Sequence, residues 1–184
     1  MNYPFAGSGP SVHEYPESRH LRDAIIRVTV GVVVLFAWAG SAFAQGRTLE
    51  GVWGVMTQER NCTTNAPQGP PTRAIVTYDG GGAFIDSRHI PVFLPGQLSE
   101  THGLWRHDGG QTYATRFVTM INFDSAAGTP PGSPGFQAGW IVGTQTITLT
   151  GPDNFTSTGR SMFFNLNREM SRVGCASRVG ERLQ

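Results

Sequence analysis

Residues 144–150 read Thr-Gln-Thr-Ile-Thr-Leu-Thr, and polar and apolar side chains alternate along the end of this stretch. Successive side chains of a β-strand point to opposite faces of its sheet. The pattern therefore predicts a strand with a row of threonines on one face and Ile147 and Leu149 on the other. Residues 112–123 behave similarly, because all of their aromatic side chains fall on one face. Both stretches are typical of half-buried strands in an antiparallel sheet.

Glycine-rich turns and loops separate the other strand-like stretches. Asp-Gly-Gly occurs at residues 79–81 and again at 108–110, and Asp-Gly between two such stretches is a strong signal for a β-hairpin. Residues 63–72 contain three prolines, so we expect a loop there rather than a strand. Residues 89–100 and 124–135 predict further loops, the first of them lying over one end of the fold. The predicted strands are 50–61, 73–79, 82–88, 101–107, 111–123, 139–150, 154–166 and 170–179.

The order of these strands predicts the fold class. Every link is short enough to join antiparallel neighbours, and no crossover helix intervenes. An open meander would leave two exposed edges, whereas closure of the sheet removes both. We therefore predict an all-β domain, a single antiparallel up-and-down barrel of about eight strands. The interior of such a barrel is either filled by side chains or holds one small ligand. A two-sheet sandwich is the alternative that the strand number also permits.

Cys62 and Cys175 are the two cysteines of the chain. In an exported protein an even number of cysteines predicts a disulfide. A disulfide between them would also suit the barrel, because the first and last strands of a closed meander are neighbours. Two free buried thiols are the alternative interpretation.

The N-terminal part predicts export. Residues 28–44 form an uncharged run that follows three arginines and ends in Ala-Phe-Ala. This order is typical of a secretory signal peptide, here cleaved between Ala44 and Gln45. A retained membrane anchor is the alternative, although seventeen uncharged residues are few for a span of about 20. We expect residues 1–44 to be leader and signal peptide, and residues 45–184 to be a barrel domain in the periplasm or outside the cell.

Composition and motifs argue against several classes of function. Residues 45–184 contain eleven arginines and ten carboxylates, so no basic excess favours nucleic acid or an anionic membrane as partner. His102 and His107 lie on one predicted strand with opposite parity and would point to opposite faces, so we predict no metal site. Nucleophile motifs and phosphate-binding loops do not occur in the sequence. We accordingly predict no catalytic residue and no cofactor.

The triplet Gly51-Val52-Trp53 opens the first predicted strand. It resembles the G-x-W element of lipocalins and related calycin-type barrels. The resemblance covers this triplet and the number of strands, and it implies a barrel whose closed end is plugged by Trp53. It further implies that an arginine of the last strand, at Arg178, packs against that tryptophan. The general pattern is also similar to that of small exported bacterial proteins.

Aromatic residues occur on nearly every predicted strand, and they are the residue type that could form a binding site. Small-molecule pockets are usually lined by aromatic and apolar side chains with few polar groups. The residues predicted to line a cavity are Trp53, Trp105, Phe117, Trp140, Phe163 and Arg116. Arg116 belongs to this set only if it points inward, where it would need a partner or an anionic ligand. The alternative is that the aromatic residues simply fill the core and that Arg116 is a solvated surface residue.

Three functions remain open on the sequence alone. The leading hypothesis is non-enzymatic binding of a small apolar or amphipathic molecule, which requires a cavity open at one end. The second is an envelope or secreted protein-interaction module, which requires a filled core and an exposed apolar patch. The third is an enzyme of the barrel-isomerase kind, which requires an inward titratable residue with a perturbed pKa. The sequence predicts neither the identity of a ligand nor the oligomeric state.

Overall fold

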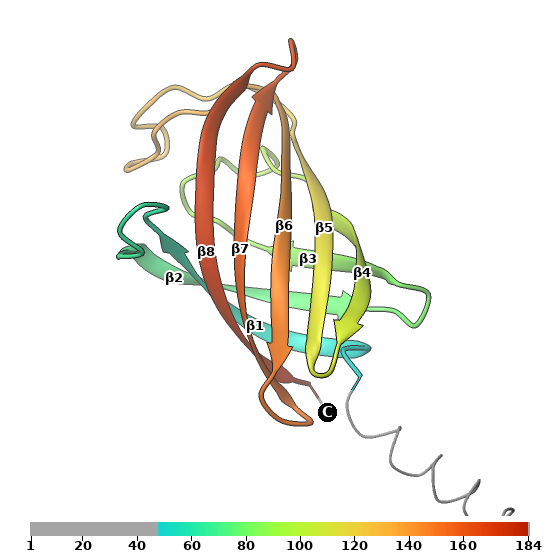
Figure 1. The fold of residues 1–184 in the computed structure, drawn as a ribbon. Helices are drawn as coiled ribbons and strands as arrows, with labels where there is room; N and C mark the ends of the chain where they lie inside the picture. The colour runs from blue at the N-terminus through green and yellow to red at the C-terminus, as the bar shows by residue number, and fades with distance from the viewer. Residues whose placement is uncertain (1–47, 184) are drawn as a thin grey trace, which may run out of the picture. The chain divides into compact units, whose positions relative to one another are not determined.

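The computed structural model describes residues 48–183, which form a closed antiparallel barrel (Figure 1). Its strands are β1 (Gly51–Arg60), β2 (Pro67–Tyr78), β3 (Ala83–Arg88), β4 (Thr101–Gly109), β5 (Thr112–Ile121), β6 (Gly139–Leu149), β7 (Asn154–Asn165) and β8 (Met170–Arg182). Each strand pairs with the next along the chain, and β8 pairs with β1 from Trp53↔Arg182 to Arg60↔Cys175. The predicted up-and-down barrel is confirmed, and the pairing of β1 with β8 excludes a sandwich of two separate sheets.

The predicted signal peptide and its cleavage site at Ala44 and Gln45 lie outside the described residues. Within residues 48–183, no helix has the length and hydropathy needed to cross a membrane.

Side-chain alternation divides the residues of each strand between the interior and the surface. On β6, Ile147 and Leu149 are buried while the intervening threonines are exposed, as the alternating sequence predicted. On β5, Tyr113 and Ile121 point inward and Arg116 is exposed. The interior is therefore built from every second residue, and the size of those residues decides how completely it is filled.

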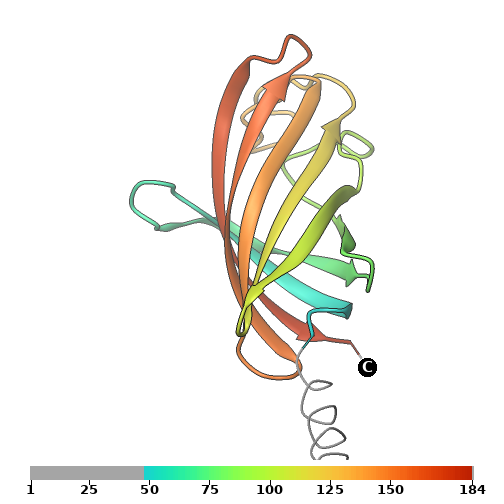
Figure 2. The same ribbon diagram turned by 45° about the vertical axis from the view of Figure 1, so that its right-hand side comes forward.

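The start of β2 departs from our prediction. We expected residues 63–72 to be a loop, but β2 begins at Pro67, so the prediction was wrong for residues 67–72. β1 pairs with β2 as far as Arg60↔Pro67, after an irregularity following Thr57, whereas β3 pairs only with residues 74–78. The prolines therefore lie where β2 has one neighbour, and a missing N–H is tolerated at such an edge. The two strands project from the barrel as an arm (Figure 2).

The closed end of the barrel has an apolar core around Trp53, which is fully buried. The Trp53 indole Nε1 donates a hydrogen bond to the Leu49 carbonyl oxygen at 2.9 Å, and its ring lies 5.0 Å from that of Phe155. Phe155 also covers Gly180 of β8, where a Cβ atom would lie 2.2 Å from the phenyl ring. A side chain at position 180 would thus collide with the ring that fills this end.

The arginine over Trp53 is not the one that we expected. The guanidinium carbon of Arg182 lies 4.3 Å from the centre of the Trp53 ring. β8 extends to Arg182, beyond the predicted end at residue 179, and Arg182 pairs directly with Trp53. Arg178 instead pairs with Thr57 and forms an ion pair with Asp86 in the barrel interior. The assignment of Arg178 to Trp53 was therefore wrong, and the arginine that contacts Trp53 lies two inward positions further along β8.

A disulfide joins Cys62 and Cys175, with Cα atoms 5.2 Å apart and a sequence separation of 113. The predicted disulfide is confirmed, which excludes the alternative of two free thiols. It links the chain just after β1 to β8, next to the Arg60↔Cys175 pair that closes the barrel. A cross-link over so long a loop stabilises the fold by about 4–5 kcal/mol in the chain-entropy model.

Two long connections cover the other end of the barrel. Gln97 anchors the connection from β3 to β4, because its side chain accepts a hydrogen bond from the Leu94 N–H and donates one to the Phe123 carbonyl oxygen. The connection from β5 to β6 supplies Phe136, whose ring stacks on Phe93 of the first connection at 3.9 Å. These rings form a second, smaller apolar cluster, remote from Trp53.

Candidate functional site

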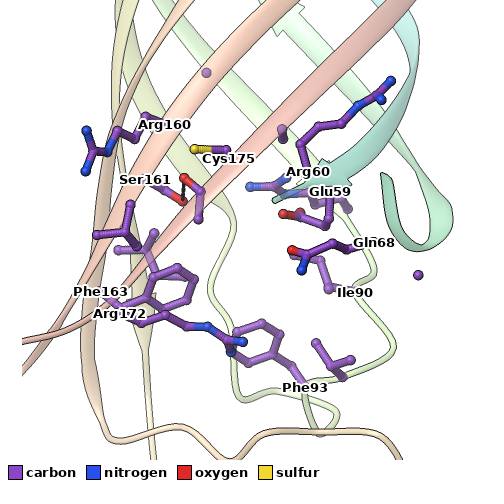
Figure 3. A pocket seen from close by; sticks show the side chains of 18 of the residues that line it. Glu59, Arg60, Gln68, Ile90, Phe93, Arg160, Ser161, Phe163, Arg172 and Cys175 are labelled. Atoms are coloured by element: carbon purple, nitrogen blue, oxygen red, sulfur yellow. Dashed lines mark hydrogen bonds between the residues drawn. The ribbon is translucent and has the colours of Figure 1, made fainter. Parts of the chain in front are cut away.

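The half of the barrel opposite Trp53 contains a partly open cavity of about 400 Å³. Figure 3 shows Glu59, Gln68 and Ile90 on one wall and Ser161, Phe163 and Arg172 on the opposite wall. The cavity therefore lies between β1, β2 and the connection after β3 on one side, and β7 and β8 on the other.

Small side chains on β7 and β8 create this space. Gly159, Ser161, Gly174 and Ala176 line the cavity on two paired strands. At the closed end, by contrast, the inward glycine at position 180 is covered by an aromatic ring. The hollow half thus follows from two successive inward positions on each of these strands that carry small side chains.

Aromatic and aliphatic residues form the outer part of the cavity wall. Phe136 lies between Phe93 and Phe163, with ring centres 3.9 and 5.9 Å away. The guanidinium of Arg172 lies 5.7 Å from the centre of the Phe136 ring. Ile90 and Phe117 add apolar surface to the wall. This region offers a desolvated surface to the apolar part of a ligand.

Charged residues form the inner part of the cavity. Arg178 Nη1 lies 2.8 Å from Asp86 Oδ2, and Arg88 Nε lies 3.8 Å from the same oxygen. The side chains of Asp86, Arg178 and Arg88 are 1%, 8% and 14% exposed. Arg88 and Arg178 line the cavity itself, whereas Asp86 lies behind them. A buried charge lowers the stability of the fold unless it is paired, and here one carboxylate is paired with two guanidinium groups.

This ion cluster, formed by Asp86, Arg88 and Arg178, makes few hydrogen bonds. Neither Asp86 oxygen has a partner with hydrogen-bond geometry, although Arg178 is within ion-pair distance, and buried Thr57 Oγ1 also lacks one. Among residues 48–183, neither guanidinium donates a hydrogen bond to another residue. A guanidinium carries five N–H donors, so the protein itself uses only a small part of the capacity of this pair.

The ion cluster also affects proton affinities. Burial raises the pKa of Tyr78 above its usual range, Arg178 opposes this increase, and Asp86 adds to it. Burial lowers the pKa of Arg88, and the like charge of Arg178 lowers it further, while Asp86 and Glu59 act in the opposite direction. An additional negative charge next to Arg88 would therefore stabilise its protonated form.

Two further charged groups point into the cavity, and two point away from it. Glu59 pairs with the inward Ala176, and Arg172 pairs with the inward Phe163, so both share the inner face. Arg60 and Arg160 both pair with Cys175, which alternates with Ala176 and lies on the outer face. Arg60 Nε donates a hydrogen bond to Ser177 Oγ on that outer face. In Figure 3 the side chain of Arg172 extends toward Phe93, whereas that of Arg160 points away from the cavity.

The structure brings two of the six predicted ligand-lining residues to the cavity, Phe117 and Phe163. Trp53 is part of the closed-end core. Trp105 packs on Tyr78, its ring 6.3 Å away, near the same end. Trp140 alternates with inward Ile141 and stacks on Phe164 outside the barrel, and Arg116 is exposed on the outer face of β5.

Sequence reasoning missed the inward charged residues Asp86, Arg88 and Arg178. A signal for the first two was present, because Phe84, Asp86 and Arg88 alternate along β3 and a buried phenylalanine predicts that the other two also point inward. For Arg178 the signal was obscured by its assignment to Trp53.

The protein is therefore an eight-stranded closed antiparallel β-barrel with an internal pocket, and charged side chains lie at the base of that pocket. Such a barrel is compatible with a lipocalin-like fold. No protein-family model matches the chain, and no curated protein matches it either. Membership of the lipocalin or calycin families therefore stays a prediction.

Proposed function

We propose that the protein binds a small amphipathic molecule in the open half of its barrel and does not convert it chemically. The observation that carries this proposal is the cavity of about 400 Å³, with aromatic residues at its outer part and charged residues at its base. Small-molecule pockets commonly have volumes of roughly 300–1,000 Å³. The volume of this cavity lies near the lower end of that range, which favours a compact ligand or one with a single short hydrocarbon chain.

The alternatives are less well supported. A protein-interaction module would need a filled core, and the open half of this barrel is hollow. An enzyme would need a titratable group that reaches a substrate. Tyr78 has a perturbed pKa, but it is 1% exposed within the closed-end core and does not line the cavity. Arg88 lines the cavity and its pKa is lowered, but a guanidinium keeps its proton and is a poor acid or base. We therefore propose binding as the function and assign no catalytic residue.

Export remains part of the proposal. The disulfide between Cys62 and Cys175 is compatible with an oxidising compartment such as the periplasm or the extracellular space. A binding protein in that location would take its ligand from the surrounding fluid or from a membrane surface.

The proposal can be tested with the neutral fluorescent probe N-phenyl-naphthylamine, whose emission increases in apolar surroundings. We expect saturable binding by the purified protein, and loss of that binding in Ala176→Phe, because the added ring would occupy the cavity. Thr158→Phe is the matched control, since Thr158 is exposed on the outer face of β7. Equal probe binding by both variants would contradict binding inside the barrel.

A further inference from the structure

We infer that the ligand is a monoanionic amphiphile whose carboxylate contacts Arg88 and Arg178 and whose hydrocarbon chain lies between Phe93 and Phe163. This inference rests on the proposed function and specifies the chemistry and the orientation of the ligand.

The first argument is the charge of the inner face. Three guanidinium groups, those of Arg88, Arg172 and Arg178, point into the cavity, and the carboxylates beside them are Glu59 on the wall and Asp86 behind the arginines. One positive charge is therefore left over, and it is matched by a singly charged anion. A doubly charged phosphate would reverse the balance inside a region of low dielectric, where unpaired charge is costly.

The second argument is the supply of donors. Asp86 is the one carboxylate within 4.0 Å of Arg88 and Arg178 among the described residues. Neither guanidinium donates a hydrogen bond to a protein group in that part of the chain, and both border the cavity. Planar guanidinium groups favour carboxylates because two parallel N–H groups match the two oxygens. A carboxylate at the base of the cavity would use donors that the protein leaves unmatched.

The third argument is the separation of charge from apolar surface along the cavity. The ion cluster of Asp86, Arg88 and Arg178 is buried, while the rings of Phe93, Phe136 and Phe163 form a separate cluster toward the covering connections. An amphiphile entering tail-first would place its charge beside Arg172 and its chain against buried ions. Head-first entry instead pairs charge with charge and hydrocarbon with aromatic rings.

The test compares decanoate with decanol, which has the same chain length and no charge, by isothermal titration calorimetry on the purified protein. We expect decanoate to bind at least about tenfold more tightly than decanol, the factor that one charge-assisted hydrogen bond of roughly 1.5 kcal/mol provides. Arg88→Gln should remove most of this difference, because it weakens decanoate binding far more than decanol binding. Arg88 is the residue to replace because the closer ion pair of Arg178 with Asp86 then remains intact.

Two matched variants locate the charge effect. Arg172→Gln removes a guanidinium from the outer part of the cavity, and Arg160→Gln removes one from the outer face of β7. Arg172 contributes to the positive charge of the cavity but does not contact the carboxylate, so Arg172→Gln should reduce the preference for decanoate less than Arg88→Gln does. Arg160→Gln should leave the preference nearly unchanged. A loss of preference in Arg172→Gln, with none in Arg88→Gln, would overturn the head-first orientation.

The outcomes separate this inference from the proposed function. If decanol binds as tightly as decanoate, the anionic ligand class is wrong while binding of an amphiphile stands. If neither molecule binds, and the neutral fluorescent probe does not bind, the proposed function itself fails. If the probe binds and both ten-carbon ligands do not, the inference about the ligand is rejected on its own.

Discussion

The two halves of this barrel are built from the same eight strands, yet one is solid and the other hollow. In the closed half, Trp53 and Phe155 meet ring to ring, and Phe155 covers the glycine at position 180. In the open half, the corresponding inward positions of β7 and β8 carry glycine, serine and alanine. Alternation decides which residues face inward, but their volume decides whether a barrel of this size is filled or can accept a ligand.

The two halves also differ in how the charged groups of their arginines are paired. At the closed end the guanidinium of Arg182 lies over an aromatic ring and its nitrogens bond to backbone carbonyl oxygens. At the base of the open half, the guanidinium groups of Arg88 and Arg178 share Asp86 and donate no hydrogen bond to other described residues. One arrangement is complete without a ligand. The other leaves guanidinium donors unmatched, as the proposed binding role requires.

The largest expected difference between the halves is in their contribution to stability. Trp53→Ala should lower the free energy of unfolding by about 3–5 kcal/mol, because it removes a fully buried ring from a filled core. Phe163→Ala should lower it by about 1 kcal/mol or less, since Phe163 is only half-buried and borders a cavity. Urea denaturation of both variants with the disulfide intact measures these values. Similar losses would show that the open half is as important to stability as the closed half.

Arg182 gives the next largest effect. Arg182→Ala should cost about 1–2 kcal/mol, because it removes a cation–π contact with Trp53 and the hydrogen bond from Nη2 to the Thr48 carbonyl oxygen at 2.8 Å. Arg182→Lys should recover only part of that loss, since an ammonium cannot reproduce the planar stacking.

The control for Arg182 is Arg116→Ala, which removes the same side chain from the exposed face of β5 and should change stability by less than about 0.5 kcal/mol. Equal unfolding midpoints for Arg182→Ala and Arg116→Ala in a urea titration would rule out a structural role for the contact with Trp53.

Much of this barrel follows from local sequence patterns. Alternation at residues 144–150 and the Asp-Gly-Gly turns predict strands and hairpins because their causes are local, namely side-chain parity and turn conformation. Strand ends are harder to predict. The prolines after Pro67 are tolerated only because β2 lacks a second neighbour there, which depends on where β3 ends.

The candidate site was less predictable than the fold. Phe117 and Phe163 were expected at the cavity and lie there, but Trp140 was selected for being aromatic although its parity places it outside. The pairing of Asp86 with Arg178 could not be read from the sequence, because 92 positions separate them and only barrel closure brings β3 and β8 to face each other across the interior. Local patterns therefore predict which face a residue occupies, and closure decides which inward residues meet.

Tyr78, a residue of the closed-end core, offers a smaller effect that depends on pH. Burial raises the pKa of its phenol, so the folded state keeps the proton at a pH where the unfolded state, with an ordinary pKa of 10.0, releases it. Stability from Tyr78 is therefore fully present below about pH 10 and declines as the pH rises, by up to about 1.4 kcal/mol per pH unit. Tyr78→Phe cannot ionise and should show a shallower alkaline decline than the parent protein, each compared with its own stability at neutral pH. The measurement is urea titration of both proteins from neutral to strongly alkaline pH. Parallel declines in stability would mean that Tyr78 ionises as readily in the folded state as in the unfolded one. The core around Tyr78 would then not exclude water as its packing implies.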